Sequence, residues 1–467
     1  MINGHSRRRL LGPVLLALVA ASGAADEVDD YLVTEMAARR IPGLALAVAR
    51  GGAIVRTSEY GLANVELAAP VGEESVFPIA SLDKELTAAG VMRLVERGQV
   101  TLDDPLGMYV EGPWRGVRLR HLLSHTSGLP DEVAPTALGR LLSEYSTEEL
   151  LAHIRQLEPV APPGERFLYS DANFVLAQLV IESAGGEPWR VFMEREIFGR
   201  AGMEAVTYFD PPALLPGRVA PYVLDTVGRL HRDPSRDIDF GPLYNDVAMT
   251  VRDFARWLLA LDGERVLSRA SRVAMWTEAR LGDGDDFEAV GQWRGYGFGF
   301  GLDEVFGHRV LTHSGFTGVG FVKLPDDELS VVVFTNLRHS AGSDPVGLAY
   351  GVAGHLVPEV SFLARQPVGD PDPARTLPVR AEYERLLSGV PDLERWAPRV
   401  RAAAWEGASS LRARARSLGP LQAFDLVGGD GGAGALVFRA RHERGRVFLR
   451  VKLDGDGRIA NLVWHHV

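Results

Sequence analysis

The sequence predicts a mixed α/β (α+β) fold: an antiparallel sheet flanked by helices, with an inserted mostly helical domain and a small C-terminal α+β domain. Strand-like segments occur near the start of the chain and again after residue 296, whereas the long stretch between them has helical apolar spacing. A proline-rich segment then precedes a second set of helix and strand patterns. At 467 residues the chain is also too long for one compact core of ordinary size.

The first predicted elements are a helix over residues 27–40 and a β-hairpin over 43–56, whose turn is the pair Gly51-Gly52. The stretch from about residue 82 to 261 is expected to be mostly helical, with clear apolar periodicity over 87–97, 174–184 and 251–261. Strands are expected again over 296–302, 308–313, 319–324 and 329–335. We expect these late strands to share one antiparallel sheet with the first hairpin.

The proline-rich segment sets the predicted domain boundaries. Residues 26–365 form the main domain, 366–378 a linker, and 379–467 a small α+β accessory domain. In the accessory domain, helices are expected over 381–387 and 400–418, followed by four short strands.

The N-terminus has the pattern of a cleaved secretory signal over residues 1–25. Positive charge at Arg7, Arg8 and Arg9 precedes an apolar stretch and then small residues before Asp26. The alternative, a membrane anchor, requires roughly 20 apolar residues, and this stretch is shorter. The arginines also fit a twin-arginine-type signal. We therefore expect an exported protein, periplasmic or secreted, without a stable membrane anchor after cleavage.

Composition excludes several classes of site and partner. The formal net charge of -11 disfavours binding to nucleic acid. The absence of cysteine excludes disulfides, thiolate metal sites and cysteine nucleophiles. We expect no metal and no organic cofactor, and a small molecule or short peptide as the partner; the sequence does not predict an oligomeric state.

One of only three lysines lies three residues after a serine. Arginine cannot give up its proton in a protein, whereas the pKa of a partly buried lysine can shift far enough for proton exchange. On a helix, this spacing brings Ser81 and Lys84 to one face, within hydrogen-bond reach. Residues 77–80 are expected to be extended and residue 82 onward helical, which places Ser81 at a helix N-terminus that favours developing negative charge.

Four motifs occur in the same order as in the serine beta-lactamase and penicillin-binding protein superfamily. The sequence resembles its class C-like branch, with carboxypeptidases, esterases and D-amino peptidases, from about residue 27 to 357. The motifs are Ser81-Leu82-Asp83-Lys84, residues 119–129 (LRHLLSHTSGL), residues 163–171 (PGERFLYSD) and His313-Ser314-Gly315. The resemblance implies a beta-lactamase/transpeptidase-like fold and an acyl-enzyme on the serine.

The resemblance also implies roles for individual residues. Ser81, Lys84 and Tyr169 match the catalytic residues, with Tyr169 as a proton relay to the leaving group. Asp171 occupies the third position of a tyrosine-x-asparagine element. The backbone N–H groups of Ser81 and Phe316 match the oxyanion hole. The matching substrate-binding residues are Asp171, His313, Ser314 and Gly315.

Two local features bear on the mechanism. His313 stands where a lysine is found in much of the superfamily, and a mostly neutral histidine attracts a substrate carboxylate only weakly, which argues against an efficient penicillinase. Asp83 and Glu85 flank Lys84, so we expect them to keep its amine protonated and to make it a charge that lowers the pKa of Tyr169. Alternatively, these acids only favour the first turn of a helix. Whether Lys84 or Tyr169 accepts the proton stays open.

Three weaker motifs favour other interpretations. His121 and His125 are spaced like zinc ligands, but the glutamate of a zinc-protease helix is missing. Residues 454–457 begin like a calcium loop, but His465 at its twelfth position cannot supply the bidentate carboxylate, so they predict a hairpin turn. The glycine-rich residues 428–432 lack a phosphate-loop lysine and predict a flexible turn.

The predicted function is hydrolysis, through an acyl-enzyme on Ser81, of an ester or small amide such as a D-amino-acid peptide. One alternative is a beta-lactamase or D-alanyl-D-alanine carboxypeptidase. A second, from another class, is a non-catalytic protein that binds peptides or peptidoglycan fragments.

Overall fold

The computed structural model describes residues 27–133, 145–208, 214–225, 228–233, 247–282, 290–291, 293–339, 342–401, 418–429 and 435–465. The predicted leader, most of the helix expected over 400–418, and residues 430–432 of the glycine-rich turn lie outside this range. Within the described residues, no helix is long and apolar enough to cross a membrane.

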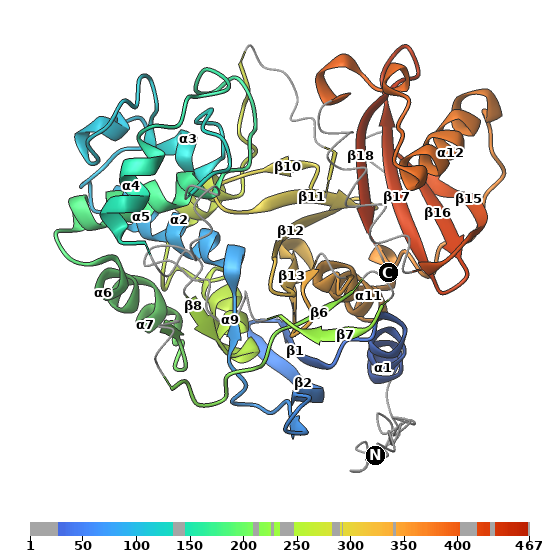
Figure 1. Ribbon diagram of the computed structural model, residues 1–467, viewed down its shortest axis with the longest axis horizontal. Helices are drawn as coiled ribbons and strands as arrows, with labels where there is room; N and C mark the ends of the chain where they lie inside the picture. The colour runs from blue at the N-terminus through green and yellow to red at the C-terminus, as the bar shows by residue number, and fades with distance from the viewer. Residues whose placement is uncertain are drawn as a thin grey trace, which may run out of the picture.

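An eight-stranded antiparallel sheet forms the centre of the molecule (Figure 1), and it joins the first hairpin to the late strands as the sequence predicts. In sheet order its strands are β10 (Gly295–Tyr296), β11 (Gly301–Val305), β12 (His308–Gly315), β13 (Val319–Leu324), β14 (Leu329–Thr335), β1 (Gly43–Arg50), β2 (Ala53–Asn64) and β3 (Ala69–Pro70).

The central strands are buried on both faces. Along β1, Ala45 and Ala47 belong to the core on one face, whereas Leu44, Leu46 and Val48 belong to the core on the other. Because side chains alternate along a strand, continuous apolar runs of this kind require a layer on each side. The first layer includes α9 (Val251–Ala260), and the second includes α1 (Glu27–Arg39) and α11 (Pro345–Leu356).

Two glycine turns shape this sheet. Gly51 and Gly52 both have positive φ, as the predicted tight hairpin between β1 and β2 requires. The expected strand over 296–302 is wrong: β10 and β11 are separate strands joined by a turn in which the Gly297 N–H donates to the Phe300 carbonyl. Gly299 has a φ of 77°, and an added Cβ would lie 2.7 Å from the Lys84 carbonyl oxygen, so the turn packs tightly against the first helix of the inserted part.

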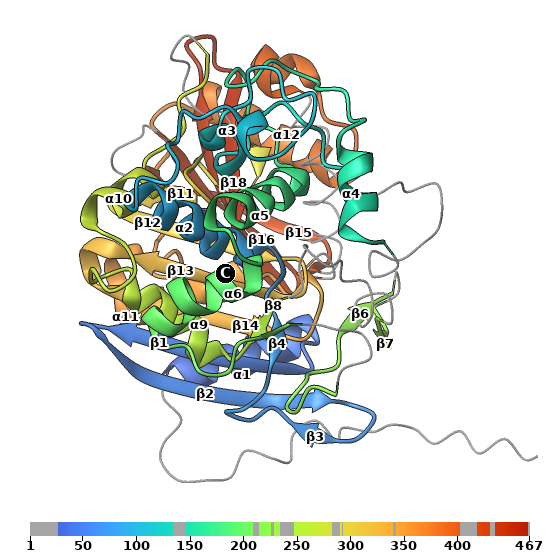
Figure 2. The ribbon, with the colours of Figure 1, turned by 90° about the vertical axis from the view of Figure 1, so that its left-hand side faces the viewer.

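The inserted part is mostly helical, as predicted, and Figure 2 views the molecule from its side. Its main helices, α2 (Asp83–Glu96) and α5 (Asp171–Gly185), pack on each other. Further helices in the described residues of this part are α3 (Leu119–Leu123), α4 (Thr147–Ile154), α6 (Trp189–Met193), α7 (Gly199–Ala201) and α10 (Arg269–Met275). Short strands complete it: β4 (Phe77–Pro78), β8 (Val247–Met249) and β5 (Thr207–Tyr208) form one sheet, and β6 (Tyr222–Leu224) pairs with β7 (Leu230–Arg232).

The C-terminal part has its own apolar core between a helix and four antiparallel strands. These elements are α12 (Pro373–Ser388), β15 (Leu421–Gly429), β16 (Leu436–His442), β17 (Gly445–Leu453) and β18 (Ile459–His465). Because α12 begins at Pro373, the second half of the segment expected to be a linker is helical. Residues 454–457 form the predicted turn between β17 and β18. A fifth strand, β9 (Val290–Gly291), joins this sheet from the main part of the chain.

Candidate active site

Ser81 lies where a strand changes into a helix. Phe77 and Pro78 pair with β8, and the Ile79 N–H donates to the Val247 carbonyl, which fixes the approach to the serine. Ala80 then has a φ of 47°, a left-handed conformation that is strained for alanine and occurs preferentially at functional sites. A 3-10 turn (Ala80–Leu82) leads directly into α2, so Ser81 stands at the predicted helix N-terminus.

Lys84 connects the serine to a carboxylate. Its Nζ lies 3.1 Å from the Ser81 Oγ and 2.7 Å from the Asp171 Oδ1. The lysine side chain is 1% exposed and that of Asp171 is 14% exposed, so this ion pair is largely shielded from water. Asp171 is the first residue of α5, which brings it to Lys84 because α5 packs on α2.

The two acids that flank Lys84 are buried, and its ion-pair partner is a third carboxylate. Lys84 pairs with Asp171, and Glu85 points into the protein, fully buried. Burial raises the pKa of Glu85 well above its ordinary value, whereas the nearby Lys84 lowers it. Burial thus weakens the tendency of this carboxyl group to ionise, and that Asp83 and Glu85 keep Lys84 protonated stays a prediction.

Tyr169 lies against both catalytic candidates. The Lys84 Nζ is 5.2 Å from the centre of the Tyr169 ring, and the Tyr169 hydroxyl oxygen accepts hydrogen bonds from the side chains of Ser81 and Lys84. Burial raises the pKa of Tyr169 above its ordinary range, and this outweighs the lowering by Lys84, whose charge Asp171 opposes. Lys84 acts on the pKa of Tyr169 in the direction expected from the sequence, but the net shift is upward, so the phenol keeps its proton near pH 7.

His313 is a buried, neutral member of the site. It lies on β12, with its Nδ1 3.0 Å from both the backbone nitrogen and the carbonyl oxygen of Ser314 and its Nε2 3.1 Å from the Tyr296 Oη. Burial, with a smaller contribution from Lys84, lowers the pKa of His313 to about 3. This agrees with the expectation that the position provides no permanent cation.

The end of β12 packs against the backbone that precedes the serine. An added Cβ on Gly315 would lie 2.5 Å from the Ile79 carbonyl oxygen, so only glycine fits this contact. The Thr317 Oγ1 donates to the Pro78 carbonyl at 2.7 Å. Phe316 lies between these two contacts, and its own carbonyl accepts the His339 N–H. Its backbone is thus held beside the turn that carries Ser81, and the oxyanion pair of Ser81 and Phe316 stays a prediction.

The two histidines spaced like zinc ligands accept different backbone hydrogens. His121 accepts the Arg118 N–H in the first turn of α3, and His125 accepts the Ser170 N–H through Nδ1. The His125 ring also lies 4.2 Å from that of Tyr169, so this histidine supports the tyrosine from behind. Among the described residues, no group of three histidine or acidic side chains could hold a metal ion.

Three further residues lie near the site but belong to no recognisable sequence motif. Asp131 accepts the Asp171 N–H at 2.8 Å, and protein atoms cover part of this residue while the rest is exposed to solvent. Desolvation and the neighbouring Asp171 carboxylate raise the pKa of Asp131 to about 6. Tyr296 and Trp293 complete an aromatic wall, since the Trp293 ring lies 4.9 Å from His313 and 5.2 Å from Tyr296.

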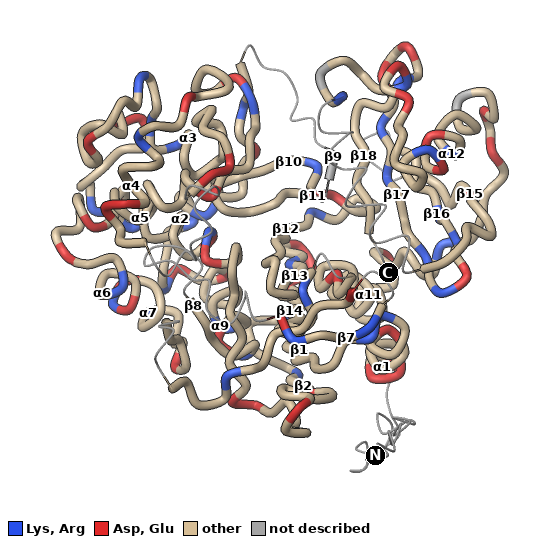
Figure 3. The backbone as a smooth tube through the Cα atoms, in the orientation of Figure 1, with Lys and Arg blue, Asp and Glu red and all other residues tan. Residues whose placement is uncertain are grey.

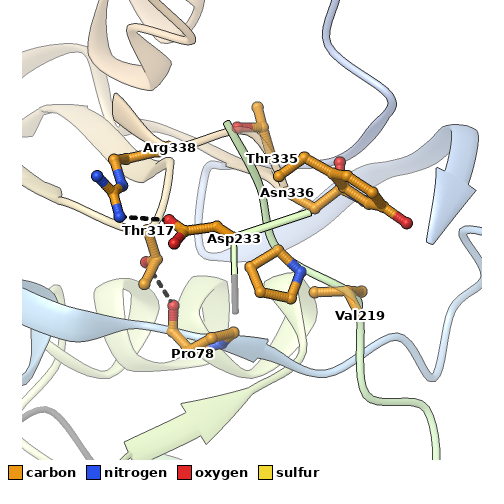
Figure 4. A pocket seen from close by; sticks show the side chains of 9 residues that line it. Pro78, Val219, Asp233, Thr317, Thr335, Asn336 and Arg338 are labelled. Atoms are coloured by element: carbon orange, nitrogen blue, oxygen red, sulfur yellow. Dashed lines mark hydrogen bonds and ion pairs between the residues drawn. The ribbon is translucent and has the colours of Figure 1, made fainter. Parts of the chain in front are cut away.

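A separate pocket adjoins the segment that leads to the serine (Figure 4). Its lining includes Pro78, Thr317 and an ion pair between Asp233 and Arg338. Ser81 is not part of this lining, so the reactive groups lie outside the pocket. The hydrogen bond from Thr317 to the Pro78 carbonyl, at the edge of the pocket, supports the backbone that precedes the serine turn.

Comparisons with known proteins agree on one family. The Beta-lactamase family profile matches residues 28–356. The chain is 29% identical to penicillin-binding protein 4* of Bacillus subtilis (57% of this chain, 61% of the relative) and 33% identical to esterase EstB of Burkholderia gladioli (41% and 53%). It thus spans between half and two thirds of the length of these relatives.

Solved structures are similar in fold. A penicillin-binding protein from Bacillus halodurans matches with a TM-score of 0.60 and 26% identity, over 71% of this chain and all of that one. The octameric penicillin-binding protein homologue from Pyrococcus abyssi matches 92% of this chain and 94% of its own, with a TM-score of 0.62; at 23% identity this likeness shows the fold alone.

The residues and the comparisons point the same way. A shielded serine, lysine and tyrosine meet at the start of α2, and the end of β12 faces them. The matched region contains all of these residues. The chain therefore belongs to the Beta-lactamase family of serine hydrolases.

Proposed function

We propose that this chain hydrolyses uncharged esters and small amides through an acyl-enzyme on Ser81. The observation that carries the proposal is the buried chain of contacts from the Ser81 Oγ through the Lys84 amine to the Asp171 carboxylate, with Tyr169 against it. A serine hydroxyl is a weak nucleophile until a neighbouring group takes its proton. Of the two groups in contact with Ser81, Lys84 and Tyr169, we assign this role to Lys84, because burial keeps the phenol protonated.

The ion pair supplies the base. In a shielded site, the charged pair of Lys84 and Asp171 can exchange one proton to become a neutral amine and a carboxylic acid, because burial penalises separated charges. The amine then takes the proton from Ser81 as its Oγ attacks the substrate carbonyl. Tyr169, which burial keeps protonated, donates its proton to the leaving group and recovers one from Lys84. The backbone N–H groups of Ser81 and Phe316 stabilise the oxyanion.

The electrostatics support a substrate without a carboxylate near the scissile bond. His313 is neutral, so it offers no cation to such a group. Asp171 and Asp131 instead place two acidic side chains beside the lysine. Among the relatives, one is named an esterase, and structures of similar fold include a D-amino acid amidase from Ochrobactrum anthropi. We therefore rank esters and D-amino acid amides above penicillins and D-alanyl-D-alanine peptides.

A panel of substrates tests this order. Initial rates with p-nitrophenyl acetate, D-alanine p-nitroanilide, nitrocefin and a diacylated lysyl-D-alanyl-D-alanine peptide should give the highest kcat/KM for one of the first two. Ser81→Ala should abolish turnover, and the matched control Ser58→Ala, on β2, should keep it. Faster turnover of nitrocefin or the peptide would favour the beta-lactamase or carboxypeptidase alternative. Binding of peptidoglycan fragments without turnover of any substrate would favour the non-catalytic alternative.

We also propose that the protein is exported, on the strength of the charged, apolar and small-residue order in residues 1–25. Mass spectrometry of the protein released from the periplasm or the medium should find a mature N-terminus close to Asp26. A chain that keeps its first 25 residues and needs detergent for release would instead support the membrane anchor.

A further inference from the structure

The C-terminal sheet includes two residues that belong to the main part of the chain. Val290 and Gly291 form β9, which pairs in parallel with β18 at Leu462 and Val463. Figure 3 labels β9 beside β18, near the point where β10 begins. The strand order β15-β16-β17-β18-β9 therefore ends on a segment that lies more than 160 residues earlier in the sequence.

Trp293 follows this strand almost immediately. Its half-buried indole ring lies 4.9 Å from His313 and 5.9 Å from Tyr169, between ring centres. On its other side it covers Gly301, where an added Cβ would lie 2.1 Å from the indole Cδ1. Because Tyr169 is the proton donor to the leaving group in the proposed reaction, Trp293 stands on the leaving-group side of the site.

A buried polar cluster makes a second connection between the C-terminal sheet and the main part of the chain. The guanidinium of Arg450, on β17, pairs with the Asp303 carboxylate on β11 and also donates to the Glu304 carbonyl. The Tyr350 Oη donates to the second oxygen of Asp303 at 3.2 Å. Asp303 lies two residues after Gly301, so the C-terminal sheet holds both the segment that carries Trp293 and the strand that Trp293 covers.

We propose that Trp293 is a specificity-determining residue that packs against an apolar leaving group, and that the C-terminal sheet positions it through the pairing of β9 with β18. The specificity part of this inference rests on the proposed function, which supplies the substrate class. The position of Trp293 can be measured without any substrate. The accessory part of the chain is then a structural part of the active-site wall.

The positioning is tested by fluorine NMR of the full chain labelled with 5-fluorotryptophan. The Trp293 resonance is the one that disappears in Trp293→Phe. Val290→Pro and, separately, Gly291→Pro remove backbone hydrogen-bonding capacity from β9 and should shift or broaden this resonance. The matched control Gln422→Pro lies at the bulge of β15, the opposite edge strand of the same sheet, and should leave it unchanged. An unchanged Trp293 resonance in both β9 variants would overturn the positioning claim.

The specificity is tested with benzyl acetate and ethyl acetate. Both esters give the same acetyl-enzyme and both release an alkanol, so the ratio of their kcat/KM values reports contacts with the leaving group. Trp293→Ala should lower the benzyl-to-ethyl ratio about fivefold, the scale of one aromatic contact, whereas Trp293→Phe should keep it within about twofold. The β9 variants should change the ratio in the same direction as Trp293→Ala.

The outcomes separate the two proposals. An unchanged ratio in Trp293→Ala, with turnover intact, would overturn the specificity claim and leave the proposed function standing. Absence of turnover of both esters, of p-nitrophenyl acetate and of D-alanine p-nitroanilide by the unmodified protein would overturn the proposed function and the specificity claim together, and the fluorine signal would still decide whether the C-terminal sheet positions Trp293.

Discussion

The ion pair between Lys84 and Asp171 makes a quantitative prediction for Asp171→Asn. Removal of one partner of a buried pair typically costs about 3–5 kcal/mol, because the other charge stays buried. Three features of the site reduce this cost. Asp171 is 14% exposed, asparagine retains an oxygen that can accept a hydrogen bond from Lys84, and the substitution relieves repulsion from Asp131. We therefore expect the lower limit, about 3 kcal/mol, or roughly two orders of magnitude in the unfolding equilibrium.

The same substitution removes the carboxylate that takes the Lys84 proton in the proposed reaction. We expect kcat/KM for p-nitrophenyl acetate to fall about a hundredfold, the lower part of the range for general-base catalysis. Urea unfolding followed by tryptophan fluorescence measures the stability, and initial rates measure the activity.

The matched control is Asp103→Asn. Asp103 pairs with Arg120 at the same distance, 2.7 Å, but their side chains are 63% and 44% exposed. Exposed pairs contribute about 0–1 kcal/mol, so this variant should behave almost like the unmodified protein. Equal stability of the two variants, together with kcat/KM for Asp171→Asn within about threefold of normal, would refute the assignment of Asp171 as the counter-ion and proton acceptor.

Three further substitutions test the site. Tyr169→Phe should keep the fold, because the ring contacts remain, and should lower kcat/KM about a hundredfold or more in the same ester assay; a loss below tenfold would exclude the phenol as the proton donor. His313→Lys should raise nitrocefin turnover relative to ester turnover, because an amine holds a proton far more readily than an imidazole and can place positive charge at this position; an unchanged ratio in paired assays would contradict this. The pKa of Asp131, about 6 in the folded protein against about 3.9 unfolded, means that its ionisation destabilises the fold as the pH rises through this interval. Asp131→Asn should therefore raise the unfolding midpoint at pH 7–8 but not below pH 4, and a gain that is the same at both pH values would argue against the shift.

The elements that the sequence predicts well are those with a local physical cause. The run from Leu44 to Val48 is apolar at every position, which only a strand covered on both faces can bury, and the Gly51-Gly52 pair fits only a tight turn. The contact between Ser81 and Lys84 follows from helical spacing alone.

The parts that the sequence does not predict depend on packing between distant segments. Asp171 contacts Lys84 because α5 packs on α2. The two residues are 87 positions apart in the sequence, and no local pattern predicts their contact. Glu85 is an acid on a helix that is buried almost all round, whereas acids in a first turn are ordinarily solvated. Trp293 follows a two-residue strand that pairs with the end of the chain, and so short a strand has no periodicity to detect.

The central claim is that Ser81 becomes acylated. A fluorophosphonate probe followed by peptide mass spectrometry tests it most directly, because the probe reacts with an activated serine and leaves a covalent adduct. The account predicts one adduct on the peptide that contains Ser81, slower labelling in Lys84→Met and none in Ser81→Ala. A folded protein that gains no adduct, or an adduct that persists in Ser81→Ala, would contradict it.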